Sequence, residues 1–251
     1  MRTKRIVIPA AAVIVVIAVS FLAYGWWTRR GPVTYSRGGT FDATPSASAS
    51  GSAGPAVGTY RFAATGGEHV KLGSLPACSW PVRDVTLTVG ADPSGSVFDL
   101  TLGAGRIERA IYTYSRDRIT LDFSASTVTC FGVRTTTQDD YQPPAVRYRL
   151  PPVVGQRWST TAVTQDRTEK ATVTVLRRER VTVPAGTFDA YVFDVTGSFN
   201  GSQSGTFHSV EWFVPSLKTW VKTTQSTRAT RSGATFTSDY TLSLVSGPSL
   251  G

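Results

Sequence analysis

Residues 171–195 read ATVTVLRRERVTVPAGTFDAYVFDV and contain the pattern that decides the fold. The first five residues alternate apolar with polar side chains, as a strand with one face in water requires. Further on, Pro184 presets φ for a turn and Gly186 can accept a positive φ. The stretch therefore predicts two antiparallel strands joined by a tight structural turn.

The same period-two alternation recurs along the chain, whereas no stretch after residue 56 shows the spacing of a long amphipathic helix. Gly, Pro, Asp and Ser punctuate the runs at the spacing of hairpin turns, which leaves little room for parallel crossovers. We expect an all-β antiparallel meander of about 10–12 strands that forms a curved sheet or half-barrel. The clearest runs are residues 85–89, 98–102, 119–123 and 146–150, and the clearest turns are 91–95, 103–105, 115–117 and 200–202.

Two later strands are apolar on both faces. Phe188, Ala190 and Val192 alternate with Tyr191 and Phe193, and a second such run spans residues 207–213. A sheet covered on both sides by packed core explains this pattern, and so does a curved sheet that encloses an apolar ligand cavity. The candidate residues for an apolar pocket are Phe188, Val192, Val210 and Trp212.

Residues 6–27 form an uncharged apolar stretch that, as a helix, spans about 33 Å and can cross a bilayer. Trp26 and Trp27 end it like an interfacial aromatic belt. The basic residues before it favour a cytoplasmic N-terminus and a single-pass cell-membrane protein. A cleaved signal peptide, which would make the protein secreted, is the alternative, with a small-x-small site at residues 18–20.

The composition divides the chain into five parts. Gly, Ser, Ala and Pro dominate the stretch after the apolar segment, and such a composition cannot bury enough surface to order itself. We expect a cytoplasmic basic tail at 1–5, a transmembrane signal anchor at 6–27, a flexible linker at 28–56, an extracytoplasmic β domain at 57–246 and a frayed tail at 247–251.

The 251 residues carry 26 Lys and Arg against 17 Asp and Glu, for a net charge of +9. More than half of this basic excess lies in residues 1–56, on either side of the apolar segment. The charge is therefore a signal of membrane topology, and we expect no nucleic-acid partner. Arg far outnumbers Lys and Asn200 is the single asparagine, which is typical of a GC-rich bacterial genome.

The chain contains two cysteines, Cys78 and Cys130. In an exported domain they form a candidate disulfide, which would stabilise the fold by about 4 kcal/mol in the chain-entropy model. Two buried free thiols are the alternative. A zinc site is not expected, because only His69 and His208 could complete it.

We find no pattern that predicts catalysis. In GSQSG at residues 201–205, Gln203 stands where a G-x-S-x-G elbow would need its serine. His208 and Glu211 are three residues apart, which places them on opposite faces of a strand. We therefore expect a non-enzymatic protein with no cofactor and no metal.

Three segments resemble a known layout: VVGQRW at 153–158, VTVPAGTFDA at 181–190 and WFVPSLKTWV at 212–221. Together, over about residues 150–225, they are similar to uncharacterised bacterial envelope domains with the LolA-like lipoprotein-carrier half-barrel. Lys218-Thr219 departs from the layout, in which a glycine-rich turn is common. The resemblance implies a shape and an exported location, and it implies no catalytic residue.

These observations favour a membrane-anchored envelope protein that binds a lipid or another envelope component. The alternative is a structural or interaction module with a fully packed sheet that contacts another envelope protein. An extracytoplasmic hydrolase is a third hypothesis, and it would depend on His208 or Glu211.

Overall fold

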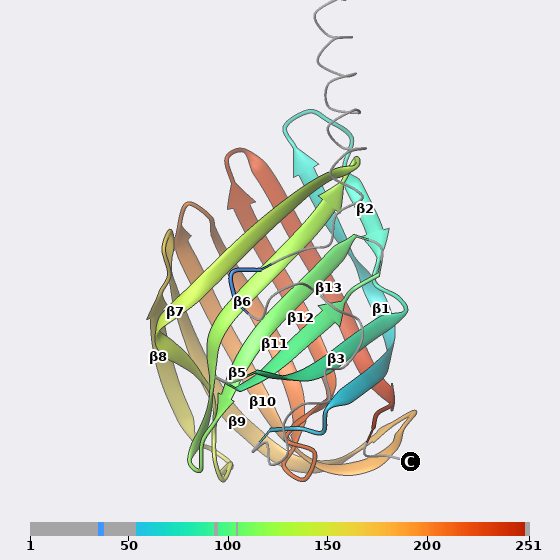
Figure 1. Cartoon of the computed structure of the whole chain (residues 1–251), viewed down its shortest axis with the longest axis vertical. Coiled ribbons are helices and arrows are strands. Elements are labelled where there is room, and N and C mark those ends of the chain that lie inside the picture. The colour runs from blue at the N-terminus through green and yellow to red at the C-terminus, as the bar shows by residue number, and fades with distance from the viewer. Residues whose placement is uncertain (1–34, 38–53, 93–94, 104, 249–251) are drawn as a thin grey trace, which may run out of the picture.

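A computed structural model describes residues 35–37, 54–92, 95–103 and 105–248. This part of the chain contains thirteen antiparallel strands and no helix (Figure 1). The all-β antiparallel prediction is therefore confirmed. The strands are β1 (Gly58–Leu72), β2 (Cys78–Pro81), β3 (Val85–Asp92), β4 (Gly95–Thr101), β5 (Arg106–Tyr114), β6 (Arg118–Cys130), β7 (Val133–Arg149), β8 (Arg157–Val163), β9 (Arg167–Val183), β10 (Gly186–Gly201), β11 (Ser204–Val214), β12 (Thr219–Arg231) and β13 (Ala234–Ser246).

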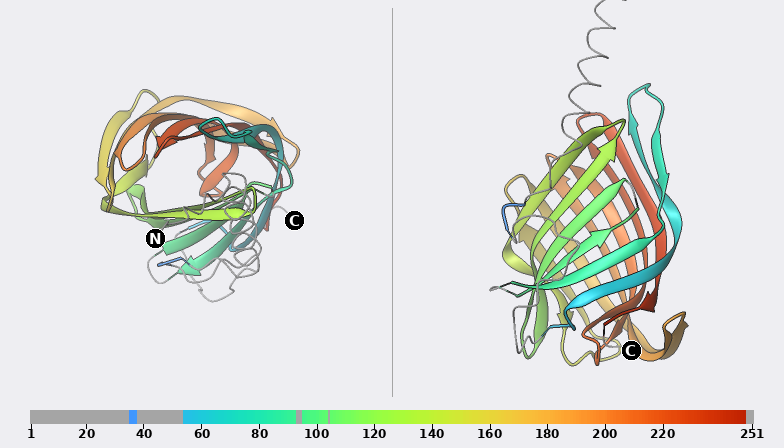
Figure 2. Two further views of the ribbon diagram at one scale, coloured as in Figure 1. Left: turned by 90° about the horizontal axis from the view of Figure 1, so that it is seen from above. Right: turned by 45° about the vertical axis from the view of Figure 1, so that its right-hand side comes forward.

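The sheet closes into a barrel. β1 pairs with β13 along residues 61–72, and neighbouring strands pair in chain order around the rest of the ring (Figure 2). The short strand β2 pairs with β1 alone among the described strands, so the other twelve form the ring. The prediction of a curved sheet or half-barrel was wrong on closure, because the first and last strands meet in a long ladder that removes both edges.

The turn predicted from VPAGTF has the expected form. Val183 at the end of β9 pairs with Gly186 at the start of β10, and Gly186 has a φ of 133°. The turn between β11 and β12 places Lys218 at a φ of 55°, a conformation in which glycine is favoured. The side chain that departs from the family layout therefore occupies a position that suits glycine.

One end of the barrel is filled by packed side chains. The hairpin of β9 and β10 bends beneath this lower end in Figure 1, and the N–H of Ala185 at its tip donates to the carbonyl oxygen of Leu244 on β13 (3.0 Å). The larger of the two main core clusters includes Tyr60, Phe62, Val85, Leu87, Val181, Val192, Leu242 and Leu244. In the smaller cluster, the rings of Tyr148 and Phe213 stack beside Phe193 with their centroids 4.6 Å apart.

Part of the predicted linker is packed on the barrel. Tyr35 is 3% exposed, lies against Ile111 and Phe123, and its hydroxyl is 3.2 Å from Oγ1 of Thr127. The guanidinium of Arg109 lies 5.0 Å from the centre of the Tyr35 ring. The composition of residues 28–56 predicts a flexible tether, but this tyrosine is anchored by burial, aromatic contact and a hydrogen bond.

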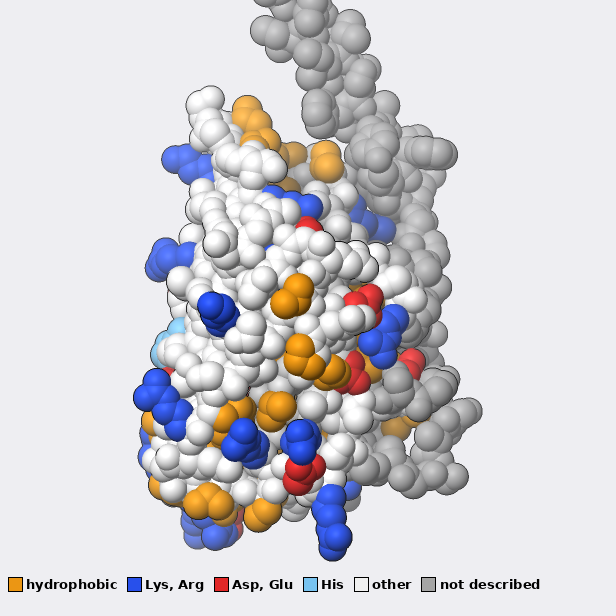
Figure 3. All heavy atoms as spheres, turned by 90° about the vertical axis from the view of Figure 1, so that its left-hand side faces the viewer, with side chains coloured by type: hydrophobic (Ala, Val, Ile, Leu, Met, Phe, Trp, Pro, Cys, Tyr) orange, Lys and Arg blue, Asp and Glu red, His pale blue; other side chains and the backbone are white. Residues whose placement is uncertain are grey.

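The predicted anchor at residues 6–27 lies outside the described residues. Within the described part of the chain, no helix is long and apolar enough to cross a membrane. On the face of the barrel that Figure 3 turns to the viewer, the basic side chains are dispersed among polar ones and do not gather in one patch.

Candidate functional site

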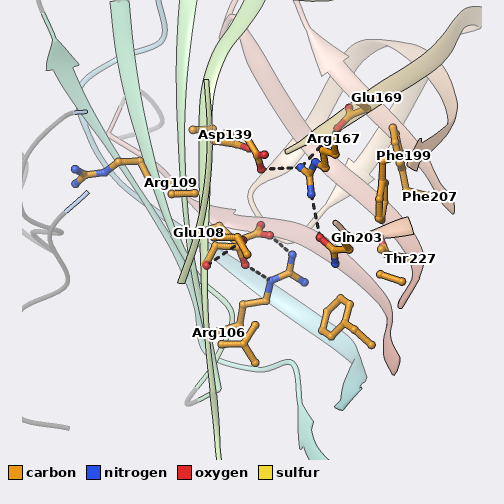
Figure 4. A pocket seen from close by; sticks show the side chains of 18 of the residues that line it. Arg106, Glu108, Arg109, Asp139, Arg167, Glu169, Phe199, Gln203, Phe207 and Thr227 are labelled. Atoms are coloured by element: carbon orange, nitrogen blue, oxygen red, sulfur yellow. Dashed lines mark hydrogen bonds and ion pairs between the residues drawn. The ribbon is translucent and has the colours of Figure 1, made fainter. Parts of the chain in front are cut away.

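A cavity of about 450 Å³ lies inside the barrel (Figure 4). Its lining includes Cys130 and Thr135 at the β6–β7 turn, Gln203 at the β10–β11 turn and Ala234 at the start of β13. The cavity therefore lies toward the end opposite the bent β9–β10 hairpin. Its size is within the range of small-molecule sites.

The first polar group of the wall is centred on Arg106 of β5, whose side chain is 9% exposed. Its Nη1 donates to Oε1 of Glu68 (2.5 Å), and its Nη2 donates to Glu108. Glu68 is fully buried and also accepts hydrogen bonds from Nε1 of Trp80 (2.9 Å) and Oγ of Ser238 (2.7 Å). The Glu68 carboxylate is therefore satisfied by three donors, as a buried charge requires.

The second polar group is centred on Arg167 of β9. Its Nη2 lies 2.7 Å from Oδ2 of Asp139 and 3.8 Å from Oε2 of Glu169, and its Nη1 donates to Oε1 of Gln203 (3.0 Å). The hydroxyl of Tyr141 donates a longer hydrogen bond to Glu169 (3.4 Å). One arginine thus connects β7 and β9 to the β10–β11 turn, as the dashed lines of Figure 4 show in part.

The third polar group holds Glu211 of β11. Arg147 and the hydroxyl of Tyr148, both on β7, donate to its two carboxylate oxygens, and Oγ of Ser209 adds a bond of 3.0 Å. Glu211 is 4% exposed. This group links β7 to β11 across the interior, beside the aromatic cluster that contains Tyr148.

Three aromatic rings complete the wall: Phe199, Phe207 and Phe236. The Phe199 and Phe207 rings stack with centroids 6.5 Å apart and an interplanar angle of 17°. The guanidinium carbon of Arg167 lies 5.1 Å from the Phe199 centroid, and that of Arg106 lies 5.0 Å from the Phe236 centroid. The rings therefore already present their faces to positive charge.

Burial changes the acid–base behaviour of this wall. It raises the pKa of Glu108, Asp139 and Glu169 above the ordinary carboxyl value, and the nearby arginines only partly offset the effect. Burial also raises the pKa of the Tyr112 phenol to about 12. The interior thus disfavours the ionised form of these carboxyls. Glu108 shares Arg106 with Glu68, and Asp139 shares Arg167 with Glu169.

The four residues proposed for an apolar pocket come together, but they pack as core. Val192 and Trp212 are buried members of the larger cluster, and Phe188 and Val210 pack against it. None of the four lines the 450 Å³ cavity. The strands that are apolar on both faces therefore belong to the packed core, and the cavity is lined by other residues.

Cys78 and Cys130 are neighbouring free thiols, and Cys130 lines the cavity. Cys78 begins β2 and Cys130 ends β6. β1 pairs with β3 over residues 58–62 only, and farther along β1 the short strand β2 takes the place of β3. Burial and the neighbouring thiol raise the pKa of Cys130 to about 12. The structure places the two sulfurs in contact, and the disulfide itself stays a prediction.

The histidines lie apart from the cavity lining. Nε2 of His208 is 2.7 Å from Oδ1 of Asp194 on the exposed side of the sheet, while Glu211 is buried inside. Nδ1 of His69 is 2.8 Å from Oγ of Ser79. His69 lies within β1, where Gly66 and Gly67 continue the ladder with β13.

Sequence reasoning missed the charged wall. The run Arg106-Ile107-Glu108 alternates as expected for a strand, but such a pattern is normally interpreted with its polar face in water. In a closed barrel the polar face can point inward and pair with itself. The missed signal was the repeated spacing of charges by two residues, in Arg106 and Glu108 and again in Arg167 and Glu169.

The fold and its cavity define the chain as a closed antiparallel β-barrel with a charged and aromatic interior. Residues 80–226 match the DUF3108 family, described as "Protein of unknown function", and the chain belongs to this family. No curated protein matches the chain. A solved structure described as a "putative lipoprotein" from Parabacteroides distasonis ATCC 8503 is similar at 14% identity, over 76% of this chain and 95% of that one, with a TM-score of 0.28.

Proposed function

We propose that the chain is a non-enzymatic ligand-binding protein of the bacterial envelope. The barrel binds a small amphiphilic molecule in its interior, on the outer side of the cell membrane, and residues 6–27 hold it there. The observation that carries this proposal is the 450 Å³ cavity, whose wall combines aromatic rings with fixed polar groups. Ligand sites typically have this mixture of apolar surface and a few placed polar groups.

The composition of the wall narrows the ligand. Hydrocarbon chains alone would leave the groups around Arg106 and Arg167 without water or a polar partner on their cavity side, at a cost in desolvation. A molecule with both a polar group and an apolar body matches the wall better. The proposed ligand is therefore an amphiphile with substantial polar character.

Two alternatives fit the described residues less well. A module with a fully packed sheet needs no cavity, yet the barrel contains one of about 450 Å³. A hydrolase needs a nucleophile and a base within reach of the same substrate, but His208 and Glu211 lie on opposite faces of β11.

The test is recovery of a bound molecule. The full-length protein, purified in a non-ionic detergent, is extracted with organic solvent and analysed by mass spectrometry. Thr227 lines the cavity, whereas the adjacent Ser226 lines a shallow groove on the outer face. Thr227→Phe should reduce the recovered molecule at least tenfold, and Ser226→Phe should leave it unchanged.

Repeated recovery of nothing from the wild-type protein would contradict the proposal. Equal recovery from both variants would show that the molecule is bound outside the barrel. Circular dichroism of the two variants shows whether each retains its β structure.

A further inference from the structure

The ion-pair groups around the cavity contain more carboxylates than arginines, although the lining itself has five arginines and three carboxylates, because Glu68 and Glu211 lie behind it. Arg109 and Arg231, which also line it, have acidic partners of their own in Asp99 and Asp166. The remaining three arginines are shared among five carboxylates. The pairs are Arg106 with Glu68 and Glu108, Arg147 with Glu211, and Arg167 with Asp139 and Glu169.

Two of the five carboxylates are poorly compensated and reach the cavity. Glu108 shares Arg106 with the fully buried Glu68, and its side chain is 26% exposed. Glu169 lies 3.8 Å from Arg167, which is held more closely by Asp139, and its side chain is 17% exposed. Both line the cavity. Burial raises the pKa of both carboxyls, and the nearby arginines only partly offset this effect.

The aromatic part of the wall suits a positive ligand. Phe199, Phe207 and Phe236 line the same cavity, and two of them already lie within about 5 Å of an arginine guanidinium. A cation gains both from a carboxylate and from the face of a phenyl ring when the site excludes water. An anionic group would meet the two poorly compensated carboxylates instead.

We propose that the barrel binds an organic cation, an amine attached to an apolar body, with its ammonium group at Glu108 or Glu169 and its apolar body on the phenylalanine rings. This inference rests on the proposed ligand-binding function and specifies the charge class of the ligand. The bound amine supplies the positive charge that the arginines of the wall do not.

The experiment compares three probes of similar size and different charge: 2-phenylethylamine, 2-phenylethanol and phenylacetate. Their binding to the full-length protein is measured by isothermal titration calorimetry at neutral pH. We expect the amine to bind at least tenfold more tightly than the alcohol, and phenylacetate to bind most weakly. Equal binding of amine and alcohol, or tighter binding of phenylacetate, would overturn the inference.

Two variants locate the charge. Glu169→Gln and Glu108→Gln should each weaken binding of the amine about three- to tenfold and leave binding of the alcohol unchanged. Asp117→Asn is the matched control, because Asp117 is an exposed carboxylate that pairs with Arg118 in the turn before β6. The control should bind all three probes like the wild type.

The outcomes separate this inference from the proposed function. Binding of the alcohol or of phenylacetate in preference to the amine leaves a ligand-binding barrel but excludes the cation. If none of the three probes binds, the charge of the molecule recovered by extraction decides: a cation supports the inference, and a neutral or anionic molecule overturns it. Failure of both probe binding and extraction contradicts both proposals.

Discussion

Phe207 of β11 lies directly across the ladder from Gly197 of β10, and a Cβ atom at Gly197 would be 2.2 Å from the Phe207 ring. Two residues along, the roles are reversed, since Phe199 of β10 pairs with Gly205 of β11. Each phenylalanine thus covers the glycine of the opposite strand. The two glycines leave the space in which the cavity's stacked rings lie.

Gly197→Ala should therefore displace the Phe207 ring and disturb the cavity. Overpacking of this kind costs about 1–3 kcal/mol, which urea denaturation would measure as a loss in the free energy of unfolding. Gly90→Ala is the control, because a Cβ atom there meets nothing within 4 Å. Its stability should stay within about 0.5 kcal/mol of the wild type. Similar losses in both variants would contradict the proposed ring packing.

Tyr35 should hold residues 35–37 against β5 and β6. Tyr35→Ala removes the buried ring and its contact with Arg109, so trypsin should cleave after Arg37 at least tenfold faster than in the wild type. Tyr35→Phe keeps the ring and loses only the hydroxyl contact with Thr127. It should be cleaved within about twofold of the wild-type rate. An unchanged rate for Tyr35→Ala would show that the ring does not hold the segment.

The thiols of Cys78 and Cys130 should form a disulfide when an oxidant such as oxidised glutathione accepts their two electrons and two protons. Closing a loop of roughly 50 residues should raise the free energy of unfolding by up to about 4 kcal/mol. Because the pKa of Cys130 is raised to about 12, little of this thiol is ionised at neutral pH. The reaction should therefore be slow at pH 7 and faster at pH 9.

Thiol labelling and intact mass, measured on the protein before and after oxidation, would follow the reaction. Cys78→Ser should abolish the gain in stability on oxidation. A protein that keeps both thiols after prolonged oxidation at pH 9 would exclude the bond.

The raised pKa of Glu108 predicts how stability depends on pH. Between the carboxyl value of the unfolded chain, near pH 4.3, and the higher folded value, the folded state binds more protons. The free energy of unfolding should therefore fall as pH rises through this window. Glu108→Gln cannot ionise, so it should gain about 1 kcal/mol over the wild type at pH 8 and lose this advantage near pH 4.

Asp117→Asn is the control for this effect, because the pKa of Asp117 is shifted in the opposite direction. The exposed Arg118 lowers the pKa of Asp117, so ionisation of this carboxyl favours the folded state. The variant should therefore gain nothing at pH 8. A Glu108→Gln variant that is less stable than the wild type at pH 8 would show that its ion pair with Arg106 outweighs the cost of burial.

The sequence predicted the local elements of the fold well. The alternating run at 171–175 lies in β9, and VPAGTF forms the turn between β9 and β10. Both depend on side chains close together in the chain, where periodicity and the conformational limits of Pro and Gly act directly. Closure between β1 and β13 depends on a register between distant strands, which no local pattern encodes.

The lining of the cavity could not be predicted from the sequence, because it depends on which side chains the closed barrel buries. Val192 and Trp212 have the composition of a pocket wall, but their neighbours fill the space around them. Arg106 and Glu108 have the composition of a wet face, but the closed barrel turns them inward. Likewise, Tyr35 lies in a segment whose average composition predicts disorder, and one aromatic side chain is enough to dock it. Composition describes a segment, whereas each of these outcomes depends on what a single side chain meets.

The docking of Tyr35 also sets a geometric limit. Only residues 28–34 separate the predicted anchor from this fixed point, and a fully extended chain of that length spans roughly 28 Å. The outer side of β5 and β6 would therefore stay within roughly 28 Å of the anchor, and the barrel could pivot there but not move farther away. A molecule leaving the membrane would meet the same flank of the protein each time, so the path from lipid to cavity would have a preferred direction.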